Sequence, residues 1–184
     1  MNHTALLLID IQNDYFEGGS QPLHQPLAAA LNAQQLLNHF RSHHLPVVHI
    51  QHEATRPEAT FFKPDTIGID IHSTVAPIAN EKVIVKHFPN SFRATELLSH
   101  LQHLQVNHLV VSGMMTHMCV DATVRAAKDL GFTITLIGDA CATKDLSVFD
   151  QTVKADEVQT ALLAALNYFY ATVIQTSQFV QEFK

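Results

Sequence analysis

Short apolar runs alternate with stretches of helical periodicity along most of the chain. Six runs are nearly continuous in apolar and often β-branched residues, which is typical of strands buried on both faces of a parallel sheet. Between the runs, apolar side chains recur at the three- and four-residue spacing of helices that bury one face. The alternation predicts repeated βαβ units and a doubly wound sheet of six parallel strands. The strands are expected near 5–9, 47–51, 82–86, 108–113, 133–138 and 171–175.

Four apolar stripes predict the helices that cover this sheet. The stretch from Glu53 to Pro77 has no sustained period and contains three prolines besides Gly68, so it predicts a long loop with at most one short helical turn. The last residues, 177–184, predict a short amphipathic helix. The helical stripes are Ala33, Leu36, Leu37 and Phe40; Leu97, Leu98, Leu101 and Leu104; Val120, Val124 and Ala127; and Val158, Ala161, Leu162, Ala165 and Leu166.

Composition narrows the class of protein. A chain of 184 residues with 47% hydrophobic and 15% charged residues is typical of one ordinary soluble domain, here 1–184. The net charge of −6 comes from scattered residues, and no stripe of Lys and Arg marks a face for nucleic acid or an anionic membrane. No signal-like segment or transmembrane run is present, so a cytoplasmic location is expected. The two cysteines, Cys119 and Cys141, are expected to be reduced.

Three reactive residues follow predicted strands. Asp10 ends the first strand, Lys86 ends the third, and Cys119 begins the helix after the fourth. The carboxyl ends of parallel strands meet at one sheet edge, where ligands bind at the switch in strand order. At a helix N-terminus, a thiol is expected to lose its proton more readily than one in an apolar core. Convergence of the three would form a nucleophilic site.

Each of these residues also has an ordinary structural explanation. Cys119 taken alone could be a small buried hydrophobe, Asp10 a turn-forming acid and Lys86 a solvated strand end. Their joint placement favours chemistry over structure. Cys141 matches no nucleophile pattern and is interpreted as structural.

Three segments carry a resemblance to a known family. They are LIDIQNDYF at 8–16, VKHFPNSF at 85–92 and GMMTHMCV at 113–120. In order and spacing they resemble the isochorismatase-like cysteine hydrolase family across nearly the whole chain. The resemblance implies a three-layer α/β/α sandwich, isochorismatase-like and Rossmann-like, around a six-stranded parallel sheet. It also implies a catalytic triad of Asp10, Lys86 and Cys119.

The chemistry that the resemblance implies is hydrolysis of a C–N bond in a small amide, ureido or carbamoyl compound. Cys119 would form a thioester, Asp10 would act as general base and acid, and Lys86 would be the electrostatic partner. Family members carry a cis peptide that corresponds here to Met114–Met115, and an oxyanion hole would use the backbone N–H groups of Met115 and Cys119. The expected partners are a small-molecule substrate and further copies of the chain, as a dimer or tetramer.

Other activities stay open at this stage. Isochorismate-cleaving members hydrolyse a vinyl ether and characteristically lack the cysteine, so Cys119 favours C–N hydrolysis. A non-enzymatic scaffold would not need the three polar residues. A thiol redox sensor would use Cys119, but no resolving cysteine lies close to it in sequence.

Ligand-binding residues are harder to choose from the sequence. No cofactor is expected. Nicotinamidase relatives bind a metal through an Asp-x-His pattern that the segment 49–53 lacks, which leaves His52, Glu53 and His72 as a weak metal-binding candidate. Gln12 could face the crevice or cap the loop beside it. The candidate substrate pocket comprises Gln12, Phe16, Phe92, Met115 and Thr116.

Overall fold

All six predicted strands form one parallel sheet in the order β3-β2-β1-β4-β5-β8. The structure is a computed structural model that describes residues 3–182. The strands of the sheet are β1 (Thr4–Ile9), β2 (Val47–His52), β3 (Lys82–Lys86), β4 (His108–Met114), β5 (Thr133–Ala142) and β8 (Thr172–Ile174). The main departure from expectation is β5, which continues past 138 and therefore includes Cys141.

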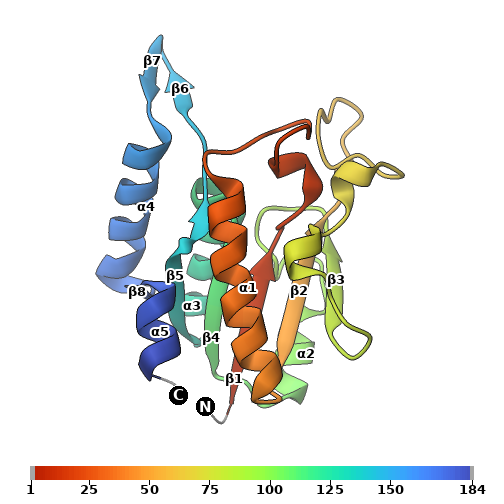
Figure 1. The fold of residues 1–184 in the computed structure, drawn as a ribbon, viewed down its shortest axis with the longest axis vertical. Helices are drawn as coiled ribbons and strands as arrows, with labels where there is room; N and C mark the ends of the chain where they lie inside the picture. Colours follow the sequence, from red (N-terminus) through yellow and green to blue (C-terminus); the bar gives the residue numbers. More distant parts are fainter. Residues whose placement is uncertain (1–2, 183–184) are drawn as a thin grey trace.

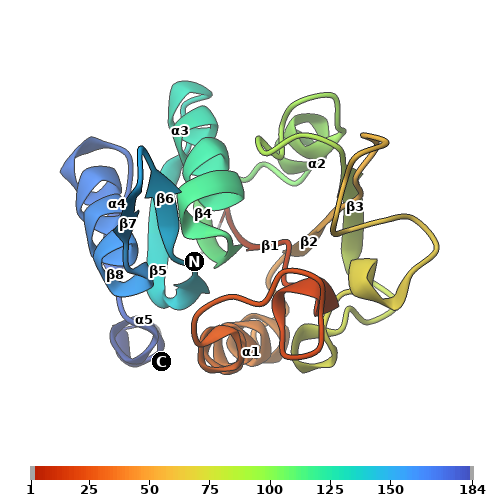
Figure 2. The same cartoon turned by 90° about the horizontal axis from the view of Figure 1, so that it is seen from above.

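Helices cover both faces of the sheet, which gives the expected three layers (Figures 1 and 2). Alternate residues of β1 divide the core: Leu6 and Leu8 join the apolar cluster under α1 and α5, whereas Leu7 and Ile9 join the cluster under α2, α3 and α4. Both faces of this central strand are thus buried. The helices are α1 (Pro26–Ser42), α2 (Leu97–His103), α3 (Asp121–Asp129), α4 (Ala155–Phe169) and α5 (Thr176–Glu182).

The strand order reverses between β1 and β4. From β1 the chain adds β2 and β3 on one side, then returns to place β4 on the other side of β1. Gly113 of β4 lies opposite Ile9 with φ +147°, and a Cβ there would overlap the Ile9 carbonyl oxygen. The next bond, Met114–Met115, is cis, as the resemblance implied. Only glycine allows the two strands to approach this closely at the switch point.

The predicted loop after β2 is present and contains two 3₁₀ turns, Ile67–Ile69 and Ser73–Val75, where at most one was expected. It is fastened to the segment that follows β1. Asn13 donates a hydrogen bond to the carbonyl oxygen of residue 67 at 2.8 Å, and Asp14 accepts one from the Phe62 N–H at 2.6 Å. The loop therefore has a fixed position beside the carboxyl ends of the strands.

A β-hairpin between β5 and α4 was not anticipated. It consists of β6 (Leu146–Val148) and β7 (Gln151–Val153), and its two turn residues, Phe149 and Asp150, have positive φ angles of 50° and 62°. Figure 1 shows the hairpin extending beyond the sheet. In residues 3–182 there is no helix with the length and apolar character needed to span a membrane.

Candidate active site

The three predicted catalytic residues lie together at the carboxyl edge of the sheet. Lys86 Nζ is 2.8 Å from Asp10 Oδ2 and donates to Cys119 Sγ at 3.3 Å. Asp10 and Lys86 are fully buried, and Cys119 is 3% exposed. Residues separated by up to 109 positions therefore meet because β1, β3 and β4 all end at this edge.

Lys86 is the centre of the cluster. Burial alone would lower the pKa of its ammonium group, but the charges of Asp10 and Cys119 outweigh burial and raise this pKa. Lys86 is therefore a cation at neutral pH. Its Nζ also donates to the Phe88 carbonyl oxygen at 3.1 Å and approaches His52 Nδ1 at 2.9 Å.

The surroundings of Cys119 differ from the expected helix N-terminus. Cys119 lies in a single π-helical turn, Thr116–Val120, that precedes α3, and it is almost completely buried. Burial, followed by the negative charge of Asp10, raises the pKa of the thiol, and the Lys86 ammonium only partly opposes them. The expectation of an easily ionised thiol is therefore wrong, because the loss of hydration and the Asp10 charge outweigh the Lys86 ammonium. The resting form is the thiol.

Asp10 is placed to receive that thiol proton. Its backbone has a positive φ of 50° directly after β1, which turns the side chain toward the cluster's other members. Both carboxylate oxygens are buried, and neither has a hydrogen-bond donor in bonding geometry among residues 3–182, so the contact of Oδ2 with Lys86 is an ion pair. Cys119 Sγ lies within 4.8 Å of the carboxylate. A buried acceptor without a fixed donor beside a neutral thiol is suited to general-base chemistry.

His52 belongs to the cluster, although the sequence pattern marked it only as a weak metal-binding candidate. It ends β2, and its Nδ1 is 3.9 Å from Asp10 Oδ2. The carboxyl-end argument that selected Lys86 applies equally to His52 and could have identified it. Tyr15 was missed as well: burial and then the charges of Cys119 and Asp10 raise its pKa, which places the phenol close to the cluster.

Gln12 is a structural clamp. Its Nε2 donates to the carbonyl oxygens of His52 at 2.9 Å and Ile69 at 2.7 Å, and its Oε1 accepts from the His52 N–H at 2.7 Å. Both amide hydrogens are used by backbone oxygens, so Gln12 joins β2 to the loop and has no free N–H for a ligand.

The other candidate pocket residues lie in different surroundings. Thr116 is fully buried, and its hydroxyl contacts Gln159 Oε1 at 2.7 Å. Phe92 stacks on Phe132 with 6.0 Å between ring centroids, in the core under α2 and α3. Met115 is 5% exposed and belongs to the core cluster on the α1 side. Packing and hydrogen bonding therefore account for these three side chains.

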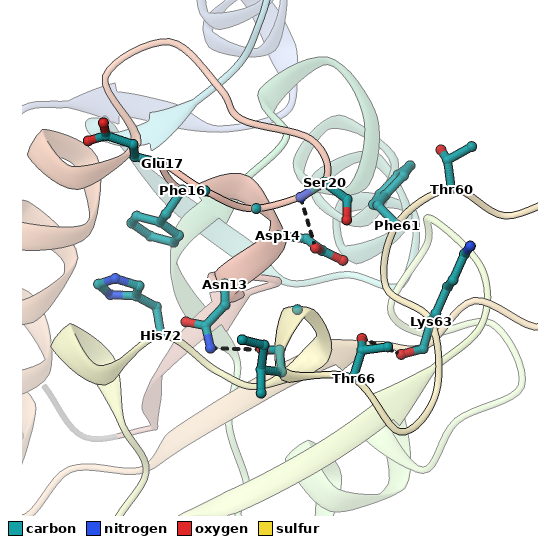
Figure 3. Close-up of a pocket in the computed structure, with 14 residues that line it drawn as sticks. Asn13, Asp14, Phe16, Glu17, Ser20, Thr60, Phe61, Lys63, Thr66 and His72 are labelled. Atoms are coloured by element: carbon teal, nitrogen blue, oxygen red, sulfur yellow. Dashed lines mark hydrogen bonds between the residues drawn. The ribbon is translucent and has the colours of Figure 1, made fainter.

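Phe16 does line a cavity, of about 420 Å³, between the segment after β1 and the loop (Figure 3). Its ring stacks on His72 at 3.7 Å between centroids. A smaller cavity of about 110 Å³ is lined by His52, Phe62 and His87 together with loop residues 54–56 and 58–61. The two cavities share Thr60 and Phe61 in their walls. His52 is the member of the buried cluster that lines the smaller cavity.

The proposed metal set is not assembled. In the described part of the chain, the grouped metal-ligand atoms are those of Asp10, His52 and Cys119, without Glu53 or His72. Lys86 Nζ lies 2.8, 2.9 and 3.3 Å from these three residues and therefore occupies the space between them. An internal cation already neutralises the donors, so the cluster does not fit a metal ion.

Comparison with known proteins agrees with this arrangement. Residues 4–178 match the Isochorismatase domain. The isochorismatase family protein YddQ of Bacillus subtilis strain 168 is 51% identical, over 97% of this chain and 99% of its own length. A streptothricin hydrolase from Streptomyces noursei is 34% identical over 77% of this chain and 50% of its own length.

A solved structure extends the agreement to three dimensions. The crystal structure of an isochorismatase-type hydrolase from Oleispira antarctica superposes with a TM-score of 0.94 at 46% identity, covering 98% of this chain and 97% of that one. Family profile, sequence relatives and fold all agree, so the chain belongs to the isochorismatase family of hydrolases.

Proposed function

We propose that the protein is a cysteine hydrolase that cleaves a C–N bond in a small amide, ureido or carbamoyl compound. The observation that carries the proposal is the contact of Lys86 with both Asp10 and Cys119 in a buried cluster. A nucleophilic thiol, a carboxylate base and a fixed cation are the groups that acyl transfer through a covalent intermediate requires.

In the first half-reaction, Asp10 takes the proton of the Cys119 thiol as sulfur attacks the carbonyl carbon. The raised pKa of this thiol supports activation by a base during attack rather than a preformed thiolate. The oxyanion of the tetrahedral intermediate accepts hydrogen bonds from the Met115 and Cys119 backbone N–H groups. The C–N bond then breaks, Asp10 protonates the leaving nitrogen, and a thioester remains on Cys119.

In the second half-reaction, Asp10 takes a proton from water as the water oxygen attacks the thioester carbon. The C–S bond breaks, the acid is released, and Cys119 recovers its proton. Lys86 stays protonated throughout, because Asp10 and Cys119 raise its pKa, and it balances the negative charge that moves between these two residues. The substrate approaches through the cavity beside His52. The unpaired cysteines are consistent with a cytoplasmic enzyme.

The test is a hydrolysis screen over amides, ureides, carbamoyl compounds and isochorismate. Cys119→Ala should abolish amine or ammonia release, whereas Cys141→Ala, a matched change of the other buried cysteine, should retain it. Rapid quench and intact-mass analysis should detect an acyl adduct on the wild-type protein and none on Cys119→Ala. Isochorismate cleavage that survives in Cys119→Ala would instead indicate a vinyl ether hydrolase.

A further inference from the structure

The Lys86 ammonium has more acceptors than hydrogens. Its three N–H bonds face four groups: Asp10 Oδ2 at 2.8 Å, His52 Nδ1 at 2.9 Å, the Phe88 carbonyl at 3.1 Å and Cys119 Sγ at 3.3 Å. The imidazole is the second closest of the four. Asp10 and Cys119 take part in the proposed hydrolysis, and the Phe88 carbonyl is a backbone group. The contact with His52 is therefore the one whose role is not yet explained.

For this contact to be a hydrogen bond, His52 must be neutral with its lone pair on Nδ1. Its charged neighbours favour that state. Burial, followed by the positive charge of Lys86, lowers the pKa of His52 to about 4, and His87 and Arg56 act in the same direction. The negative charge of Asp10 acts in the opposite direction, but the pKa of His52 is still lowered. The proton of the neutral ring is then on Nε2.

The position of His52 is fixed from two sides. Its backbone N–H and carbonyl are both bonded to the Gln12 side chain, and its ring lies 5.7 Å from the ring of Phe62. The side chain is 18% exposed, whereas Asp10 and Lys86 are 0% exposed. His52 therefore lies between the buried ammonium and the cavity that it lines together with Phe62 and His87.

We propose that His52 is a positioning residue whose neutral imidazole accepts a hydrogen bond from Lys86 and holds the ammonium between Asp10 and Cys119. With one N–H directed to His52, Nζ also donates to the Phe88 carbonyl oxygen and to Cys119 Sγ, and it stays 2.8 Å from Asp10 Oδ2 as an ion pair. Loss of this acceptor removes one hydrogen bond to the charged form of Lys86, which favours its deprotonation. The catalytic consequence of this role rests on the hydrolase function proposed above, but the hydrogen bond does not.

The hydrogen bond is tested without substrate, by long-range ¹H–¹⁵N NMR of the histidine rings in the full chain. The signals missing from His52→Asn identify His52. We expect the Nε2–H tautomer with an unprotonated Nδ1 from pH 8 down to pH 5. An Nδ1–H tautomer, or protonation of His52 near the ordinary pKa of 6.5, would overturn the proposal.

The positioning role is tested by kinetics of His52→Leu and His52→Asn on a substrate from the screen. Asn keeps an acceptor near the place of Nδ1, whereas Leu removes it. Loss of one hydrogen bond to a charged group predicts that kcat/KM falls about tenfold in His52→Leu, with recovery in His52→Asn. The alkaline limb of the pH profile should move to lower pH in the Leu variant only.

Control variants separate this role from general damage. His103→Leu and His103→Asn change an exposed histidine on α2 and should leave both the rate and the pH profile unchanged. Equal rates for the Leu and Asn variants at position 52 would contradict the proposal. Should His52→Leu not fold, the wild-type tautomer and the His52→Asn rate still decide it. Absence of any hydrolysis, with the Nε2–H tautomer observed, would refute the proposed function and leave the hydrogen bond standing.

Discussion

The Cys119 thiol is kept in its neutral form by burial and by the negative charge of Asp10. Asp10→Asn removes that charge and leaves Lys86 as the dominant neighbour, so the thiol pKa should fall. Alkylation of Cys119 by iodoacetamide at pH 7 should therefore be faster in Asp10→Asn than in the wild type, roughly tenfold for each unit of pKa. Hydrolysis should nevertheless be lost, because the base is absent.

Peptide mass spectrometry measures the alkylation rate, and Cys141 provides an internal control since burial raises its pKa to about 12. Thermal unfolding of Asp10→Asn should confirm that the variant is folded. Slower alkylation of the folded variant would contradict the assignment of Asp10 as the group that holds the thiol proton. A simple loss of activity would not make this distinction.

Glu81 is an acid outside the catalytic cluster whose side chain is only 6% exposed, and its contacts lead to a prediction about stability. Burial alone would raise its pKa, but hydrogen bonds from Arg41, the Ile78 N–H and His49 lower it to about 2 from the ordinary 4.5. The stabilisation is therefore present above pH 4.5 and is lost as pH falls from 4.5 toward 2. Glu81→Gln should destabilise the protein by about 2 kcal/mol at pH 7.

Urea unfolding at pH 7 and at pH 3 measures this difference. The gap between Glu81→Gln and the wild type should narrow at pH 3, because the wild-type carboxylate has then lost part of its advantage. Glu58→Gln, which changes a 71% exposed carboxylate, should leave stability nearly unchanged at both values. An unchanged gap at pH 3 would show that the network does not hold Glu81 ionised.

Among the secondary-structure elements, those with one dominant hydrophobic periodicity could be predicted from the sequence. The strands that form the sheet were found because both of their faces are apolar, and the helices because one face is. The hairpin was missed because β6 and β7 have only three residues each and their turn, Phe149–Asp150, contains no glycine. Short, exposed strands leave no hydrophobic period to detect.

The candidate site likewise has one part that the sequence could predict and another part that it could not. Asp10, Lys86 and Cys119 could be selected because strand ends converge by topology. The pocket could not, since side-chain direction within loops depends on contacts that no local pattern encodes. Gln12 is an example. Its side-chain amide donates to the carbonyl oxygen of Ile69, a loop residue distant in sequence, and no local pattern indicates this contact. His52 also ends a strand at this edge, but the sequence pattern marked it only as a weak metal-binding candidate.

The close approach of β4 to β1 leads to a prediction about Gly113. Gly113→Ala would introduce a Cβ against the Ile9 carbonyl oxygen, directly before the turn that carries Cys119. Neither backbone can move without disturbing the sheet, so we expect a loss of roughly 2 kcal/mol or more in stability, together with loss of hydrolysis.

Gly18→Ala is the matched control for this substitution. Gly18 also has a positive φ, of 82°, but no atom lies within 4 Å of the position a Cβ would occupy. The Gly18→Ala variant should therefore lose only the stability that the backbone conformation costs, about 1 kcal/mol, and keep its activity. Thermal unfolding of the two variants separates the contributions, and equal destabilisation would contradict the importance of the close approach.

Exposed apolar side chains lie at both ends of the side of the molecule that the hairpin and α4 form. Phe149 at the tip of the hairpin is 92% exposed and Val148 beside it is 62% exposed, while Tyr168 and Phe169 at the end of α4 are 91% and 63% exposed. The hairpin leads directly into α4, and Figure 1 shows both along the same side of the molecule. Exposed aromatic groups of this kind mark interaction surfaces.

We propose that a second copy of the chain covers this surface, since the family resemblance implies a dimer or tetramer and closed symmetric assembly buries the same patch on each subunit.

Light scattering after size-exclusion chromatography should give an oligomer for the wild type and a smaller species for Phe149→Ser. Ile67→Ser is the matched control, because Ile67 is 82% exposed but lies on the loop between β2 and β3, across the sheet from the hairpin that follows β5. A monomeric wild type would refute the assembly, and dissociation by Ile67→Ser but not Phe149→Ser would move the interface to the loop. Because the hairpin projects from the carboxyl edge of the sheet, disassembly by Phe149→Ser should change KM more than it changes the reactivity of Cys119, whose cluster is buried within one subunit.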